Sequence, residues 1–208
     1  MGKRVVGVGD IEEAVERAMR LEEDGRVKVG ALLLVRYCGF HQDHRFSPWF
    51  ESERVVLARV TQAGAELLRG SGAATNLSEL RIAIREVLEE NDPDGPPFGA
   101  EVSDHLVFAD EVLDFIGSPD DLDLLSCAFE RAEELAEGHE ETGRDDWPMG
   151  DWEPVEFARL EAEARDLDVQ GGLDYSAALL RSEEFSRLYA NFIAGYYRDD
   201  DAGVAPDL

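Results

Sequence analysis

Residues that cross-link or anchor a chain are scarce in this sequence. It has only 2 cysteines in 208 residues, too few for the disulfide framework of a small secreted domain. Cys38 and Cys127 fall in different predicted helices among apolar residues, which predicts two free, buried thiols. The longest apolar run, 30–35, is well short of the ~20 residues of a membrane-spanning helix, and the N-terminal residues lack the pattern of a signal peptide. A soluble, cytoplasmic protein without membrane association is therefore expected.

Basic residues are also few, and lysine is nearly absent. The chain has 20 Lys and Arg against 47 Asp and Glu, for a net charge of −27, and Lys3 and Lys28 are its only lysines. Nucleic acids and anionic membranes repel such a protein, because both are bound mainly through Lys and Arg. Two interpretations of the acidity stay open: a solvated surface in an arginine-favouring host, or an acidic face for a basic protein partner.

Helical patterns account for most of the chain, and the clearest follows Ser118. Ser118 is a suitable N-cap, Pro119 suits the first helical position, and Asp120 and Asp121 place negative charge at the positive end of the helix dipole. Leucine, alanine and phenylalanine then recur at helical spacing to about Gly138, over an arc wide enough to need several neighbours. This segment is predicted to be the central helix.

The other helices are predicted from periodicity, caps and breakers, at 10–24, 27–40, 50–69, 76–90, 104–116, 154–170 and 175–197. Segment 27–40 is apolar all round and could form a strand, but its length favours a helix. The helix at 104–116 is expected to pack with the one after Ser118 as an antiparallel hairpin. Residues 138–151 are expected to be an exposed connection. The aromatic stripe of the last helix, from Phe185 to Tyr196, is expected to lie in the core.

These elements predict an all-α fold, a multi-helix orthogonal bundle of about seven helices in a single compact domain. The domain is expected to span residues 1–198, with a possible sub-boundary at the proline-rich segment 91–99, and residues 199–208 are expected to form a flexible acidic tail. The chain shows no internal repeat of fixed period. Oligomeric state is left open between monomer and homodimer.

One region resembles a known family. Residues 104–173 contain a helix that ends in an aromatic residue and Gly117, a Pro-Asp-Asp-Leu-Asp-Leu start to the next helix at 119–124, and Trp152-Glu153 ahead of an acidic helix. This order is similar to the YjaG-like family of uncharacterised bacterial proteins, and the match covers about a third of the chain. The resemblance implies an all-helical fold. It transfers no catalytic residue or ligand.

Two pairs of carboxylates give one candidate for chemistry. Glu86 and Glu89, followed by Glu101 and Asp104, have the ExxE and ExxD layout that resembles the all-helical nucleotide pyrophosphohydrolases. Carboxylates three residues apart share a helix face, so two such pairs could hold Mg²⁺ against a triphosphate. The competing explanation is chance, because spaced acidic pairs are frequent in so acidic a chain and Asp104 is already expected to cap a helix.

Cys38, His41 and His44 form the one grouping of soft-metal ligands. A zinc site needs three or four protein ligands at suitable spacing, and this spacing matches no common zinc pattern. The alternative is a surface connection that contains polar histidines. His105, expected at a helix start, and His139, expected in an acidic loop, are predicted to be solvated.

The sequence contains none of the common nucleophile, phosphate-loop or metalloprotease motifs. We therefore predict a non-enzymatic, acidic, cytoplasmic helical protein that acts through a basic protein partner, as an inhibitor or immunity-type factor. It is predicted to have no catalytic residue, cofactor or metal. The alternative is a magnesium-dependent nucleotide pyrophosphohydrolase of the all-α type, which would use Glu86, Glu89, Glu101 and Asp104.

Overall fold

The structure is a computed structural model that describes residues 8–42, 50–70, 76–90, 99–146 and 156–196. In these ranges all of the regular structure is helical, which confirms the all-α prediction. The helices are α1 (Val8–Ala18), α2 (Glu23–Cys38), a 3₁₀ turn η1 (Gly39–Gln42), α3 (Glu51–Leu68), α4 (Leu77–Glu90), α5 (Gly99–Gly117), α6 (Leu122–Asp146), α7 (Phe157–Asp168) and α8 (Tyr175–Tyr196).

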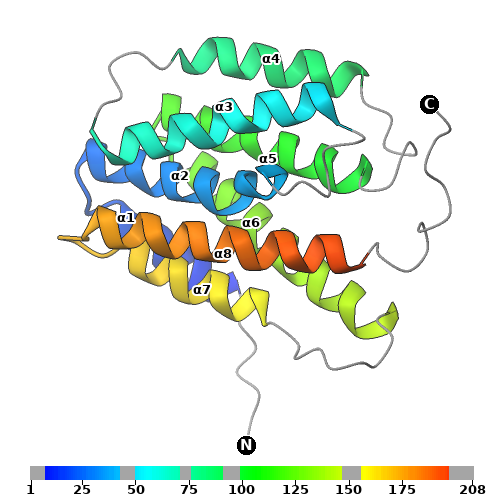
Figure 1. The fold of residues 1–208 in the computed structure, drawn as a ribbon. Coiled ribbons are helices and arrows are strands. Elements are labelled where there is room, and N and C mark those ends of the chain that lie inside the picture. The colour runs from blue at the N-terminus through cyan, green and yellow to red at the C-terminus, as the bar shows by residue number, and fades with distance from the viewer. Residues whose placement is uncertain (1–7, 43–49, 71–75, 91–98, 147–155, 197–208) are drawn as a thin grey trace, which may run out of the picture.

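The central helix is α2, which packs against α3, α5 and α8 (Figure 1). Every residue from Val29 to Cys38 is buried. A helix that is apolar all round needs neighbours on all sides, and only an interior position supplies them. The prediction that the helix after Ser118 is central was therefore wrong: that segment, in α6, keeps an acidic face on solvent. The prediction of a helix at 27–40 is confirmed.

Two glycines allow neighbouring helices to approach α2 closely. A Cβ atom at Gly30 would lie 2.7 Å from Cγ1 of Ile116 on α5. A Cβ atom at Gly64 of α3 would lie 2.9 Å from the backbone oxygen of Ala31. A side chain at either position would force the helices apart, so these glycines set the packing distance around α2.

Helices α5 and α6 pack together on either side of a short turn, as the hairpin prediction requires. The helix cap differs from the expected one. The Asp121 carboxylate accepts the backbone N–H groups of Asp123 at 3.2 Å and Leu124 at 3.4 Å. Ser118 instead accepts the Asp121 N–H through its backbone oxygen at 2.9 Å. The N-cap of α6 is therefore Asp121, three residues after the predicted Ser118.

Several other predicted helix ends were displaced. Helix α5 begins at Gly99, so Asp104 lies inside it rather than capping it, and α1 begins at Val8, ahead of Asp10. Helix α6 continues to Asp146, where an exposed connection was expected from residue 138. Glutamate and arginine are good helix formers even without apolar neighbours, so a polar segment can continue a helix. The predicted cap at Asn76 is confirmed by its bond to the Glu79 N–H at 3.3 Å.

An aromatic cluster fills the space between α2, α7 and α8. Tyr37 packs edge-to-face against Phe185 and Tyr189, with ring centroids 5.3 and 5.5 Å apart, and Phe157 contacts Phe192 at 5.3 Å. The described part of the aromatic stripe of α8 therefore lies in the core, as predicted. These contacts hold α7 and α8 to the central helix.

The helices on either side of the proposed sub-boundary pack together, because α4 contacts α5. The segment 91–98 itself, like the predicted tail at 199–208, lies outside the described residues. None of the described helices combines the length and the apolar character needed to cross a membrane.

Candidate functional site: a surface groove, a buried charge cluster and an acidic ridge

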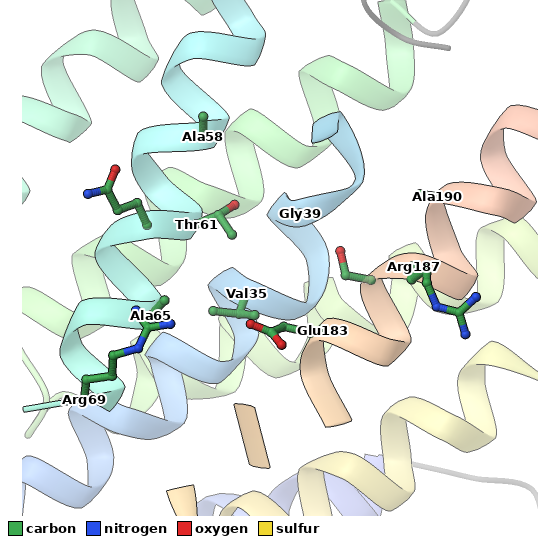
Figure 2. A pocket seen from close by; sticks show the side chains of 11 residues that line it. Val35, Gly39, Ala58, Thr61, Ala65, Arg69, Glu183, Arg187 and Ala190 are labelled. Atoms are coloured by element: carbon green, nitrogen blue, oxygen red, sulfur yellow. The ribbon is translucent and has the colours of Figure 1, made fainter. Parts of the chain in front are cut away.

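A groove lies between α3 and α8, above the end of α2. Its volume is about 560 Å³. Figure 2 shows α3 and α8 on opposite sides, with Val35 and Gly39 between them. The lining residues are Val35, Gly39, Ala58, Thr61, Gln62, Ala65, Arg69, Glu183, Ser186, Arg187 and Ala190. Helices α3 and α8 are thus held apart by α2, and the space between them is open to solvent.

Small side chains make the groove hollow. Ala58, Thr61 and Ala65 recur at helical spacing on α3, and they face Ser186 and its neighbours on α8. Gly39 is required at the floor, because a Cβ atom there would collide with the Ser186 hydroxyl. At the exposed Ala58 a large side chain would enter the groove rather than the core, whereas at Gly39 it would collide with Ser186.

Some polar side chains of the groove form hydrogen bonds or ion pairs with other described residues, and others do not. Thr61 donates to the Leu57 backbone oxygen at 2.9 Å, and Arg187 pairs with Glu184 at 2.7 Å. Ser186 is 7% exposed, and its hydroxyl has no hydrogen-bond partner in the described part of the chain. The Arg69 guanidinium likewise forms no ion pair with the described residues. Two donors in the groove are therefore free to bind something else.

A second arrangement, a buried charge cluster, joins α2 to α7. Arg36 forms ion pairs with Glu161, at 3.0 Å, and with Asp168. Its side chain is 1% exposed and those of the two carboxylates are 0% and 3% exposed. The Tyr37 hydroxyl lies 2.9 Å from both Glu161 Oε2 and the backbone oxygen of Ala132, so its single proton serves one acceptor at a time.

Burial and neighbouring charges shift the pKa values of the residues in this cluster by different amounts and in different directions. Burial alone lowers the pKa of Arg36, but Glu161 and Asp168 together raise it above its ordinary value. Burial raises the pKa of Asp168 to about 6, against the opposing attraction of Arg36. Asp168 shares that arginine with Glu161, whose negative charge also raises its pKa. Burial likewise raises the pKa of Tyr37 well above its ordinary value, so its hydroxyl stays a donor.

Arg165 of α7 is a second buried arginine, 1% exposed. Its guanidinium lies 3.7 Å from Glu133 of α6 and 5.9 Å from the centre of the Phe129 ring. None of its side-chain nitrogens forms a hydrogen bond with the described residues. The α6–α7 contact therefore contains a charge that is balanced by a neighbouring carboxylate but not hydrogen-bonded to it.

The third feature is an acidic ridge along α6 and the turn before it. It consists of the exposed residues Asp120, Asp121, Asp123, Glu130, Glu134 and Glu137. Between Leu122 and Glu137 the one exposed side chain that is not acidic is Cys127. Cys127 is a free thiol but is exposed, so the prediction of two buried thiols is right for Cys38 and wrong for Cys127. Its place on the polar face of α6 explains the difference.

The predicted magnesium ligands are not brought together in the structure. Glu86 and Glu89 are exposed on α4, while Asp104 of α5 has Arg131 and Glu134 of α6 as its charged neighbours. Burial raises the pKa of Asp104, and Glu134 adds to this while Arg131 opposes it. Among the described residues there is no group of three or more His, Cys, Asp or Glu placed to hold a metal ion, and so none that includes Glu101.

For the predicted zinc ligands, His44 lies outside the described residues. Cys38 and His41 are both buried, and the His41 ring bonds to the Cys38 backbone oxygen through Nδ1. Burial raises the pKa of the Cys38 thiol, which opposes the thiolate that a metal requires. Burial also lowers the pKa of His41 to about 4, aided by Arg54, whose Nε donates to the His41 backbone oxygen at 3.1 Å.

His105 was expected in solvent, but it is buried in the core. It bonds through Nδ1 to the Glu101 backbone oxygen at 2.5 Å and through Nε2 to the Tyr189 hydroxyl at 3.1 Å. The early start of α5 explains the error, because His105 lies in the second turn of that helix and faces Phe40, with ring centroids 4.5 Å apart. The side chain of His139 is outside the described part.

The buried arginines and the groove were not predicted from the sequence. Arg36 had a signal, because it is a charge inside a long apolar run, and such a charge needs a buried partner. Arg165 had none, since its helix carries many charges. The groove had none either, because small residues on α3 and α8 become a cavity only when the two helices face each other.

Comparison of this chain with protein-family models, with curated proteins and with solved structures gave no match. The resemblance of residues 104–173 to the YjaG-like family therefore stays a prediction.

Proposed function

We propose that this protein is a non-enzymatic, acidic binding protein, of inhibitor or immunity type, that recognises a basic protein partner through the acidic ridge of α6. The observation that carries the proposal is the arrangement of charge on this helix. Its exposed residues from Asp123 to Glu137 are acidic except at Cys127. They cover about 21 Å of helix at 1.5 Å per residue, which is the scale of a protein contact.

Few cations neutralise the ridge. Asp120 pairs with Arg26, and Glu134 pairs with Arg131 at 2.8 Å. Asp123, Glu130 and Glu137 form no ion pair with any described residue. Ridge carboxylates without an ion-pair partner among the described residues are available to arginine or lysine on another protein, and they add to the field that steers such a partner.

The rest of the surface uses its arginines differently. On α4, for example, Arg81 and Arg85 both bind Asp110 of the neighbouring helix. The arginines of α4 are therefore paired within the molecule, but its exposed Glu79, Glu86, Glu89 and Glu90 form no ion pair with the described residues. What distinguishes the ridge is that its exposed face from Asp123 to Glu137 includes no basic residue, whereas α4 exposes Arg85. The ridge is therefore the part of the described surface that best fits a basic protein.

A matched pair of variants tests the proposal by affinity capture from the native lysate at physiological salt. The ridge variant carries Asp123→Asn, Glu130→Gln and Glu137→Gln. The control carries Glu79→Gln, Glu86→Gln and Glu90→Gln on α4, and so changes the net charge equally at exposed positions. We expect the wild type and the control to retain a basic protein and the ridge variant to lose it.

Two outcomes would count against the proposal. One is that no basic protein co-purifies with the wild type. The other is that both variants weaken capture equally, which would show a dependence on net charge instead of on the ridge.

The alternative, a magnesium-dependent nucleotide pyrophosphohydrolase, stays a prediction from the spacing of Glu86, Glu89, Glu101 and Asp104. No geometry among the described residues favours it. A screen of nucleoside triphosphates with Mg²⁺ tests it directly. Turnover that is abolished by Glu89→Gln would support the hydrolase, whereas absent turnover, or turnover unchanged by this substitution, would remove it.

A further inference from the structure

We propose that the groove between α3 and α8 is a binding site for a small organic carboxylate with an apolar body. Its carboxylate would bind Arg69 and its body would lie over the small residues of the floor. This inference is independent of the acidic ridge, because the two surfaces lie on different helices and carry different charge.

The dimensions of the groove suit a small molecule. A volume of about 560 Å³ is within the range of roughly 300–1,000 Å³ found for ligand pockets. Much of the lining is apolar: Val35 lies between the two helices, Ala58 and Ala65 line the groove from α3, and Ala190 lines it from α8. A hydrocarbon chain or ring in the groove could therefore contact these small side chains (Figure 2).

Ser186 is the first polar group that indicates a ligand. It is 7% exposed and lines the groove, yet its hydroxyl has no hydrogen-bond partner among the described residues. The hydroxyl borders a groove that is open to solvent, so its hydrogen-bonding capacity is left for water or for a ligand that displaces this water. An oxygen-bearing ligand in the groove would satisfy it.

Arg69 sets the charge of that ligand. Arg69 is exposed and forms no ion pair with the described residues, so its guanidinium is available to a ligand. Figure 2 places it on the α3 side of the groove, away from Arg187. Guanidinium and carboxylate form a strong two-point contact, so a carboxylate is the group expected there.

Glu183 determines which way round the ligand binds in the groove. It lines the groove from α8, where it would repel a carboxylate. The carboxylate is thus favoured at the α3 side and the uncharged end of the ligand toward α8. A molecule with two negative ends fits this arrangement less well than one with a single acid group.

The test is a titration of the full-length protein followed by two-dimensional amide NMR. The probes are phenylacetate, 4-phenylbutyrate and octanoate, with 4-phenylbutanol and 4-phenylbutylamine as neutral and cationic matches. We expect saturable shifts at groove residues for at least one carboxylate, with an affinity about tenfold higher than for its matched alcohol, as expected for a charged pair.

Three variants assign the binding to the groove. Arg69→Gln should remove the preference for the acid over the alcohol. Arg59→Gln, at an exposed position of the same helix that does not line this groove, should leave that preference unchanged. Ala58→Phe should fill the groove from an exposed position and abolish binding of all the probes, while amide spectra report that the variant is folded.

The proposal is overturned if no carboxylate gives saturable shifts at the groove up to about 10 mM. It is also overturned if acid, alcohol and amine bind equally, or if Arg69→Gln binds the acid as well as the wild type does.

Discussion

Arg36 and Arg81 each join two helices of this protein, and they do so in different surroundings. Arg36 of α2 binds Glu161 and Asp168 of α7 with 1% of its side chain exposed. Arg81 of α4 binds Asp110 of α5 at 2.8 Å with 24% exposed. The chemical groups are the same in the two places. What differs is whether water can reach them.

That difference determines what each contact contributes. In the partly exposed network around Arg81 water competes for the charges, so such a pair is worth roughly 0–1 kcal/mol. In the buried charge cluster the pair roughly offsets the cost of taking its charges out of water, and so it adds little net stability while intact. Removal of one partner, however, leaves an uncompensated charge in the core. The comparison teaches that Arg36 specifies where α7 packs, whereas Arg81 modestly reinforces a contact that apolar residues already make.

The largest effect is expected from removal of the buried arginine. Arg36→Met should lower the free energy of unfolding by about 3–5 kcal/mol, because Glu161 and Asp168 are left buried without a cation. Arg81→Met should lower it by about 1 kcal/mol or less. Urea denaturation followed by circular dichroism measures both.

A variant that fails to fold would still be informative. In that case Arg36→Met combined with Glu161→Leu and Asp168→Leu should restore folding, because the whole charged group is replaced by apolar side chains. Equal losses for Arg36→Met and Arg81→Met would contradict the comparison.

A second prediction concerns pH. Burial raises the pKa of Asp168 from 3.8 to about 6, so the folded state holds a proton that the unfolded state releases. The stability from this group is therefore complete below pH ~4 and is lost as pH rises through 6, by roughly 2–3 kcal/mol. Asp168→Asn should remove this decline, so the stability difference between wild type and variant should change between pH 4 and 6. A constant difference over that range would disprove the shift.

His41 acts in the opposite direction over the same range and must be separated from Asp168. Burial lowers its pKa from 6.5 to about 4, so the unfolded state binds the extra proton and stability from His41 rises with pH in this window. Repeating the Asp168→Asn comparison in a His41→Gln background isolates the carboxylate. Arg81→Met, in the surface network, should leave the pH dependence of stability unchanged in both backgrounds.

A smaller effect is expected at the edge of the buried cluster. Tyr37→Phe removes a hydroxyl that lies 2.9 Å from Glu161 and keeps the ring packing. The loss of that bond should cost about 1–2 kcal/mol, because the carboxylate and the Ala132 oxygen are buried. Chemical denaturation measures it, and an unchanged stability would show that Glu161 is already satisfied by Arg36.

The smallest effect should appear in salt. The destabilisation caused by Arg81→Met should shrink toward zero in about 1 M NaCl, because exposed charges are screened over a few ångströms at that concentration. The destabilisation caused by Arg36→Met should persist, because ions do not reach the core. A buried cluster that responded to salt as the surface network does would erase the distinction drawn here.

Much of the fold could be predicted from the sequence. The helix at 27–40, the cap at Asn76 and the aromatic stripe of α8 depend on neighbours in the chain, so local pattern was sufficient. The cap at Asp121 and the start of α5 at Gly99 were missed, because several residues in each segment suit the same position and the final choice depends on packing. The magnesium and zinc predictions used spacing along the chain, and spacing does not show which helix faces which.

The sequence by itself determined the helical class and the strong negative charge, because periodicity and composition are local or summed properties. Only the tertiary structure decided that α2 is central, that Arg36 finds Glu161 across 125 positions of the chain, and that Arg69 and Ser186 border one groove. Partners this far apart meet only when helices pack. The physical reason is that a charge or a hydroxyl is defined chemically by its residue, but its burial and its partners are defined by what folds against it.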